Sequence, residues 1–214
     1  MKRKNIPFFL FMISIVVFSC SKEKSFEDPE TGSNYMPQDT LHYVDTMSHS
    51  GFRLISTDSV KEMDGITFHA YKNIPDSFPE DTTYSFLGDS SGAYYVKSFL
   101  PEWGDQKVLI LKQHAEEGDT WTNPFSVGGQ SLDVTFKVVE KGISHPVYGQ
   151  SFESVIHLEI LINNPVRTTG GDSNESFISI GDVYFAPSVG IIQLNINNPL
   201  QEDTSFYLLL ENIG

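Results

Sequence analysis

Residues 132–138 read Leu132-Asp133-Val134-Thr135-Phe136-Lys137-Val138, with apolar and polar side chains alternating at every step. A period of two is that of a β-strand, whose successive side chains point to opposite faces of a sheet. The four apolar side chains therefore predict a buried face, and the three polar side chains predict a face toward solvent. This stretch decides the fold class, because an α-helix would bring both kinds of side chain to every face.

The same alternation recurs along the chain, and no helical period of about 3.6 residues is present. It is clearest at residues 66–71, 155–162 and 192–196. Two other runs, residues 108–111 and 207–210, are apolar at consecutive positions, so we expect both faces of those strands to be covered. Aromatic residues, which favour strands, are plentiful, with 16 Phe and 9 Tyr.

Turn residues separate about ten to twelve such strands, and short connections favour a meandering antiparallel sheet. A sheet of this many strands twists and curls. We therefore predict an all-β fold, a curled antiparallel meander that forms a barrel or half-barrel with few or no helices. The polar stretch 163–176 is expected to be the longest loop and to project from the domain. Closure of the sheet is expected to depend on pairing between the first and last strands.

The N-terminus has a different pattern. Basic residues at positions 2–4 precede an apolar run at 6–18, which is too short to span a bilayer and has the flanks of a cleaved signal. Val17, Ser19 and Cys20 resemble the lipoprotein box of bacterial lipoproteins, in which the cysteine becomes the acylated first residue. The resemblance implies that Cys20 carries lipid, including palmitate, and anchors the protein to a membrane. An ordinary secretory signal with a chance cysteine is the alternative.

These features predict three segments. Residues 1–19 form the lipoprotein signal peptide, residues 20–38 form an acylated flexible tether, and residues 39–214 form a single β domain. The tether is charged and poor in apolar residues, a composition that does not build a core. The resemblance favours the outer membrane as the location and leaves open whether the domain faces the periplasm or the cell surface.

Charge excludes one class of partner. The precursor has 14 basic and 28 acidic residues, and cleavage before Cys20 removes three basic residues and no acidic ones. The mature chain then has 11 basic against 28 acidic residues, a net charge of −17. Nucleic acid and anionic lipid surfaces repel so acidic a domain, so nucleic-acid binding is excluded. Cys20 is the only cysteine, so the core must stabilise the domain without an intramolecular disulfide.

Four pieces of sequence also resemble, in the same order, an all-β domain found in bacterial lipoproteins and secreted proteins. They are the opening at 35–43, the turn Gly118-Asp119-Thr120-Trp121, the strand start at 149–155, and the hairpin Tyr184-Phe185-Ala186-Pro187-Ser188-Val189-Gly190. The resemblance implies an architecture and brings no activity with it. We expect Gly118 and Gly190 to need a positive φ or a close approach to a neighbour. We expect Trp121 to anchor the core, with its ring N–H donating to a carbonyl.

Catalytic and metal-binding patterns are scarce. Ser90 lies in Gly88-Asp89-Ser90-Ser91-Gly92, which fits Gly-x-Ser-x-Gly, but a nucleophile elbow needs a strand before it and a helix after it. Strand-like sequence lies on both sides, so the segment predicts a hairpin turn, and a hydrolase hypothesis rests on Ser90 alone. The six histidines include no His-x-x-x-His pair of the kind that zinc sites use. We therefore predict no catalytic residue, no metal site and no cofactor.

An aromatic cluster near the middle of the chain is the candidate binding site. It comprises Tyr94, Tyr95, Phe99, Trp103 and Phe125. Trp103 lies in a polar loop with Gly and Pro, where an exposed ring could stack on a sugar or cover an apolar ligand. The alternative for Trp103 is a plug over the end of the barrel. Trp103, Tyr94 and Tyr95 are the predicted ligand-binding residues.

The sequence thus predicts a non-enzymatic lipoprotein of the cell envelope, anchored to the outer membrane through Cys20. Its β domain is expected to bind a small apolar or glycan ligand, or an outer-membrane protein partner. The alternative is a structural or accessory subunit of an outer-membrane protein complex with no ligand of its own. That alternative predicts an exposed apolar patch.

Overall fold

The computed structural model describes residues 35–98, 105–127, 130–166, 174–197 and 206–214. All of them belong to one compact unit, residues 31–214. The described residues form twelve strands and one turn of 3-10 helix. These are β1 (Leu41–Asp45), β2 (Ser50–Met63), β3 (Ile66–Pro75), η1 (Pro79–Asp81), β4 (Thr83–Ser90), β5 (Ala93–Lys97), β6 (Lys107–Lys112), β7 (Thr120–Val127), β8 (Gln130–Val147), β9 (Gln150–Val166), β10 (Asn174–Ala186), β11 (Gly190–Ile196) and β12 (Phe206–Ile213).

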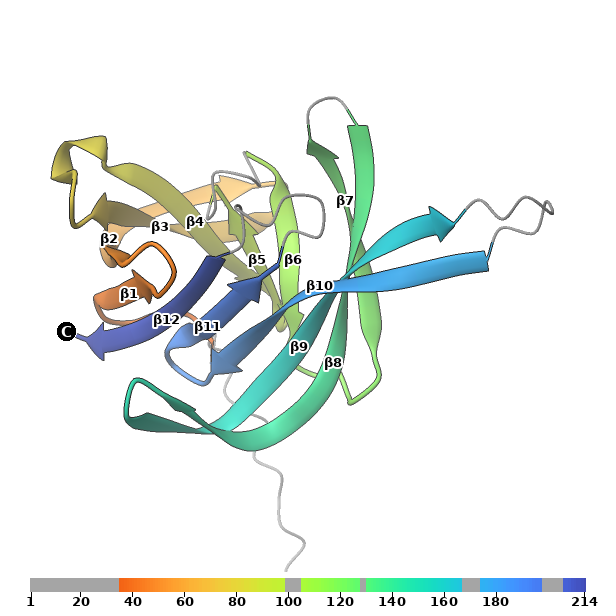
Figure 1. Cartoon of the computed structure of the whole chain (residues 1–214). Helices are drawn as coiled ribbons and strands as arrows, with labels where there is room; N and C mark the ends of the chain where they lie inside the picture. Colours follow the sequence, from red (N-terminus) through yellow and green to blue (C-terminus); the bar gives the residue numbers. More distant parts are fainter. Residues whose placement is uncertain (1–34, 99–104, 128–129, 167–173, 198–205) are drawn as a thin grey trace, which may run out of the picture. The chain divides into compact units, whose positions relative to one another are not determined.

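The strands form one antiparallel sheet in the order β6-β5-β4-β3-β2-β1-β12-β11-β10-β9-β8-β7, which curls until it is nearly closed into a barrel (Figure 1). The predicted all-β curled meander is therefore confirmed. Pairing of the first and last strands was expected to decide whether the sheet closes, and this expectation is wrong. The first and last strands do pair, with Leu41 opposite Ile213, whereas the sheet stays open between β6 and β7, which are consecutive in the chain. We call this opening the seam.

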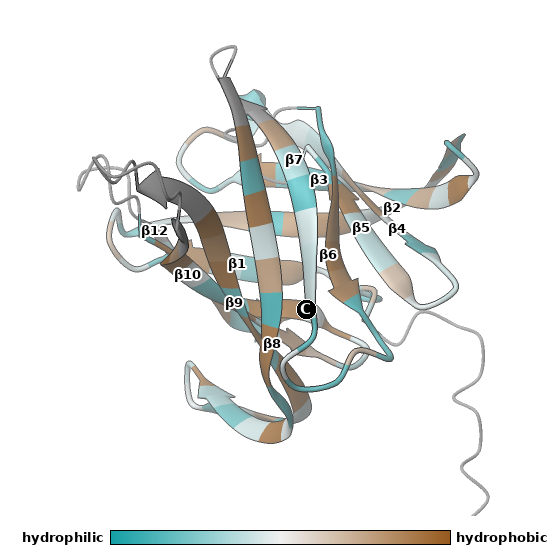
Figure 2. Ribbon diagram, turned by 90° about the vertical axis from the view of Figure 1, so that its right-hand side faces the viewer, coloured by the Kyte–Doolittle hydropathy of each residue, from teal (hydrophilic) through white to brown (hydrophobic). Residues whose placement is uncertain are grey.

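Alternating side chains build the core as the sequence predicts. On β8, Val134, Phe136 and Val138 are buried, and apolar and polar segments alternate along the strand in Figure 2. The run 207–210 keeps this simple alternation, since Leu208 and Leu210 are buried whereas Tyr207 and Leu209 are only partly covered. The prediction of two fully covered faces does not hold for that strand.

Strand β6 differs because a bulge interrupts its ladder. The register with β5 shifts between Tyr94 and Tyr95, and as a result Ile110 and Leu111 are both buried although they are neighbours. Leu109 stays partly exposed on the outer face. An extra residue of this kind bends and twists a strand, which suits a strand at the edge of a curling sheet. The two exposed lysines at its ends, Lys107 and Lys112, discourage pairing with another chain.

Before β1, a short segment enters the core. Met36 is 6% exposed, and the Pro37 carbonyl accepts a hydrogen bond of 2.9 Å from the Tyr71 hydroxyl. The ring of Tyr35 meets Tyr94 edge-on, with 5.5 Å between centroids. We call residues 35–37 the entry segment. The structure places it with the β domain, whereas the sequence analysis assigned these residues to the flexible tether.

The β9–β10 hairpin is longer than expected. The two strands pair from Val166 opposite Asn174 inward, so residues 163–166 and 174–176, which were expected to belong to a loop, are strand. This hairpin extends away from the rest of the sheet, as the sequence analysis expected of its polar stretch (Figure 1).

Candidate functional site

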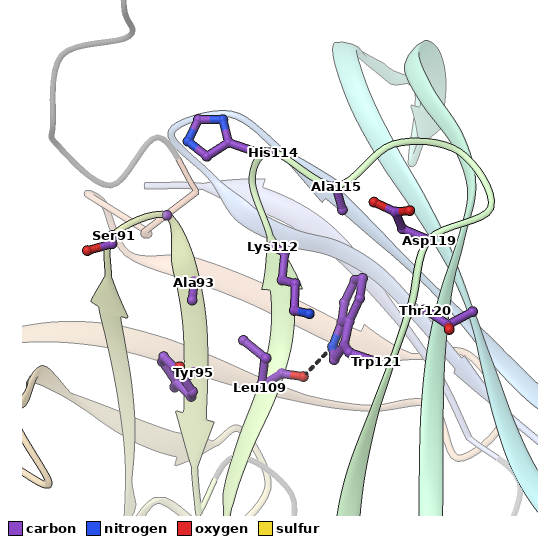
Figure 3. A pocket seen from close by; sticks show the side chains of 11 residues that line it. Ser91, Ala93, Tyr95, Leu109, Lys112, His114, Ala115, Asp119, Thr120 and Trp121 are labelled. Carbon is purple, nitrogen blue, oxygen red and sulfur yellow. Dashed lines mark hydrogen bonds between the residues drawn. The ribbon is translucent and has the colours of Figure 1, made fainter.

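A groove of about 590 Å³ lies beside the seam, where the outer faces of β5 and β6 meet the start of β7 (Figure 3). Its lining mixes apolar and polar side chains from these strands, from the β4–β5 turn and from the loop between β6 and β7. The lining residues are Ser91, Gly92, Ala93, Tyr95, Leu109, Lys112, His114, Ala115, Asp119, Thr120 and Trp121. We call it the seam groove.

The alternation of β5 sends the two predicted tyrosines to opposite faces. Tyr94 is 3% exposed and lies in the core, whereas its neighbour Tyr95 points outward and lines the seam groove. Phe125 is also buried in the core. Trp103 and Cys20 lie outside the described residues. Of the predicted ligand-binding residues, the structure therefore brings Tyr95 to the groove.

Trp121 forms one wall of the groove and also anchors the core. Its ring stacks on Phe136 with 6.0 Å between centroids and 11° between planes, and its ring N–H donates to the Leu109 carbonyl at 2.8 Å. The predicted anchor and its hydrogen bond are confirmed. The turn before it needs Gly118, whose φ is +91°, and Gly190 in the other hairpin has a φ of +88°, also as expected. Sequence analysis did not assign Trp121 to a binding site, because an anchor and a groove wall share one sequence pattern.

A side chain replaces strand pairing at the seam. The Leu109 backbone N–H donates to Asn123 Oδ1 at 2.9 Å, and Asn123 Nδ2 donates back to the Leu109 carbonyl at 3.0 Å. The Asn123 amide thus makes the two hydrogen bonds that a residue of a neighbouring strand would make. Because Asn123 is 7% exposed, these bonds are shielded from water and hold β6 and β7 one side chain apart. The floor of the seam groove is therefore fixed.

Lys112 lines the groove and Lys107 lies outside its lining, and the two lysines differ in their partners. Lys107 lies above the Tyr95 ring at 5.8 Å and also forms an ion pair of 3.1 Å with Asp64. Lys112 lies above the Trp121 ring at 5.4 Å and has no ion pair within the described part of the chain. Asp119 Oδ2 accepts the Glu116 backbone N–H at 3.0 Å, so this carboxylate shapes the turn.

Ser90 lies at the end of β4, beside the turn that leads into β5. Ser90 pairs with Ala93 across a turn in which Ser91 and Gly92 have φ values of 52° and 76°, which is the predicted strand–turn–strand. Within the described ranges, no group of three or more His, Cys, Asp or Glu side chains could hold a metal ion.

Two histidine clusters lie outside the groove. In the first, His42 on β1 lies 2.7 Å from Asp76 Oδ2 through Nε2 and 2.7 Å from Glu211 Oε2 through Nδ1. Burial lowers the pKa of His42, but the hydrogen bonds and charges of the two carboxylates outweigh it, and the pKa is raised. Arg53 lies 3.8 Å from Asp76. A Cβ at Gly51 would collide with Asp76 Oδ2, so this glycine leaves the space that the carboxylate occupies.

In the second cluster, three rings stack across β8, β9 and β10. Tyr184 lies between His145 at 4.0 Å and His157 at 4.3 Å, with nearly parallel planes. His157 also shares a hydrogen bond of 2.7 Å with Asp182. Burial, followed by the charges of Asp182 and Glu140, raises the pKa of Tyr184. These contacts join three strands, and the cluster lines no part of the seam groove.

The part of the chain that the structure describes contains no helix long and apolar enough to cross a membrane. Comparison with protein-family models, with curated proteins and with solved structures gave no match to this chain.

Proposed function

We propose that this chain is a non-enzymatic, lipid-anchored protein of the cell envelope whose β domain binds a small ligand, an apolar molecule or a glycan, in the seam groove. The resemblance of Val17, Ser19 and Cys20 to a lipoprotein box supports the anchor and favours the outer membrane as the location. The β domain is held there as a binding module.

One observation carries the binding function. The lining of the seam groove contains the aromatic and aliphatic side chains of Tyr95, Leu109 and Trp121 as well as polar groups, and its volume lies in the range of about 300–1,000 Å³ typical of small-ligand sites. The ring N–H of Trp121 and both the oxygen and the nitrogen of the Asn123 side-chain amide form hydrogen bonds at the seam, so the wall is rigid before any ligand binds. A rigid wall lowers the entropic cost of binding.

Native mass spectrometry of the full-length protein purified from its own envelope tests this function. We expect an extra mass that dissociates on unfolding and that Tyr95→Ala reduces at least about tenfold, since about 1.4 kcal/mol of lost ring contact gives that factor. Tyr84→Ala is the matched control, because Tyr84 is 49% exposed on the neighbouring strand β4 and does not line the groove. An unchanged extra mass in Tyr95→Ala would place the site elsewhere. A clean apo mass with co-purification of an outer-membrane protein would support the accessory-subunit hypothesis instead.

A further inference from the structure

Lys112 differs from most lysines of the domain because it has no carboxylate partner among the residues that the structure describes. Four others lie within ion-pair distance of an acidic side chain, in the pairs Lys97–Asp105, Lys107–Asp64, Lys137–Glu159 and Lys141–Glu116. Lys61 and Lys72 also have no ion pair within the described residues, but they lie on β2 and β3 and do not line the groove. Lys112 is therefore the lysine that brings an uncompensated positive charge into a cavity.

The acidic groups near Lys112 do not neutralise it. Asp119 is the carboxylate among the groove-lining residues, and it accepts the Glu116 backbone N–H. Glu116 pairs with Lys141 at 3.2 Å. Acidic residues outnumber basic ones 28 to 14 in this chain, so a lysine left unpaired inside a groove is available to a ligand of opposite charge. Charge-assisted hydrogen bonds to a carboxylate are among the strongest polar contacts a protein makes.

The Trp121 ring next to Lys112 indicates which chemical group of a ligand would lie beside its negative charge. Phe136 covers Trp121 from the core, and the Lys112 ammonium lies over the ring from the solvent side at 5.4 Å. A ligand that draws the ammonium aside uncovers part of the Trp121 face, and Tyr95 and Leu109 continue the apolar wall. A sugar ring matches such a surface, since its C–H face packs on aromatic side chains while its hydroxyls bond to polar groups such as Ser91 and Thr120.

We infer that the seam groove binds an acidic glycan, a sugar that carries one carboxylate, with Lys112 Nζ bound to the carboxylate and the sugar ring on the Tyr95–Leu109–Trp121 wall. This inference rests on the proposed binding function and names its ligand class. A single acid group suits the site, because the net charge of −14 repels long polyanions.

A glycan array tests the inference with the full-length protein. The probes are oligosaccharides that end in glucuronate, galacturonate or sialate, each printed beside a neutral counterpart that lacks the carboxylate. We expect at least one acidic probe to bind about tenfold more tightly than its neutral counterpart, the factor that one charge-assisted contact supplies. Titration calorimetry with that pair then gives the two affinities in solution.

Two substitutions at Lys112 and one control at Lys72 test whether Lys112 causes the preference for the acidic probe. Lys112→Met keeps most of the aliphatic stem and removes the charge, so it should abolish the preference for the acidic probe over its neutral counterpart. Lys112→Arg should retain the preference, and Lys72→Met, which removes an exposed charge away from the groove, should leave it unchanged. Equal binding of acidic and neutral probes, or a preference that survives Lys112→Met, overturns the inference while the proposed function stands. Absence of any acidic-glycan binding also overturns it, and the proposed function is then decided by the Tyr95→Ala mass measurement.

Discussion

At the scale of single residues, the Asn123 side chain forms the hydrogen bonds that a neighbouring strand would form with β6. Its amide offers one acceptor and one donor at the spacing of a backbone, and Leu109 uses both. A strand edge has unpaired N–H and C=O groups that invite other chains. One buried side chain thus satisfies part of the β6 edge and sets the width of the seam groove.

Asn123→Ala is expected to destabilise the domain by about 2 kcal/mol, because it leaves the partly buried Leu109 N–H without its acceptor. The free energy of unfolding in urea measures the loss, and hydrogen exchange at the Leu109 amide should become faster. Asn212→Ala is the control, since Asn212 is exposed on β12 and its truncation should cost less than about 0.5 kcal/mol. Undiminished protection of the Leu109 amide would show that the seam is held in another way.

His42 adds a pH dependence at the same scale. Its raised pKa means that the folded state binds the proton more tightly than the unfolded state. The stabilisation is therefore fully present below about pH 6.5, the unfolded value, and is lost as the pH rises through the folded-state pKa. His42→Gln should cost about 1 kcal/mol at pH 5.5 and less at pH 9, since partly exposed ion pairs contribute at most about that much.

Urea denaturation at the two pH values, with His69→Gln as the control for an exposed histidine on β3, checks the direction. A cost for His42→Gln that grows toward alkaline pH would contradict the assignment.

Sequence reasoning succeeded at residues whose role follows from their own chemistry. Gly118 and Gly190 have the positive φ expected of turn glycines, and Trp121 has the expected carbonyl partner. It could not identify Asn123, because an asparagine in a strand shows nothing of its partner until the two sheet edges are known. Tyr94 and Tyr95 were predicted as a pair, although neighbours on a strand must face opposite sides.

At the scale of elements, β10 depends on a glycine that packs against β11. The ladder with β9 shifts between Ser179 and Gly181, and a Cβ at Gly181 would collide with the backbone carbonyl of Asn195. The backbone of β11 cannot give way as a flexible side chain could. Close approach of two strands therefore explains this glycine, in contrast to the turn glycines.

Gly181→Ala should destabilise the domain by about 3 kcal/mol, because it overpacks a buried backbone contact. The expected fall in Tm is about 10 °C for a domain of this size, measured by thermal unfolding followed by circular dichroism. Ser179→Ala, an exposed change on the same strand, is the control. Similar Tm values for the two variants would mean that β11 shifts without cost.

Elements were predicted well where burial decides the pattern and poorly where it does not. The alternating runs at 132–138 and 155–162 form β8 and β9 as expected. The polar stretch 163–176 was expected to be a loop, but strand pairing continues through much of it because backbone hydrogen bonds need no apolar side chains. The entry segment falls within the predicted tether because nothing in its own sequence indicates burial. Its burial depends on Tyr71 and Tyr94, which lie far away in the sequence.

At the scale of the whole molecule, the proposed anchor and the acidic surface act against each other. The mature chain would carry a net charge of −17, which opposes approach to anionic lipid. The proposed anchoring would therefore depend on acyl chains at Cys20, and more than one chain would be needed, since one chain alone gives only marginal binding.

Cys20→Ala is expected to abolish incorporation of a palmitate analogue and to move most of the protein from the membrane fraction to the soluble fraction. Metabolic labelling followed by fractionation measures both, and Ser25→Ala serves as the control. Label retained in Cys20→Ala would assign the lipid to another site, and an unlabelled wild-type protein would support the ordinary secretory signal.

The central position of β1 and β12 has a consequence for folding kinetics. The two strands pair at the middle of the sheet, so their ladder closes a chain loop almost as long as the domain. Loop closure of that length is entropically costly, and high contact order slows folding. A circular permutant that starts at β7, joins Gly214 to the entry segment and ends at β6 would place every hydrogen-bonded pair of strands next to each other in sequence. The permutant should therefore fold to the same sheet faster than the natural chain. In the natural order, the edges of β6 and β7 stay unpaired until β1 and β12 have joined the two halves of the sheet.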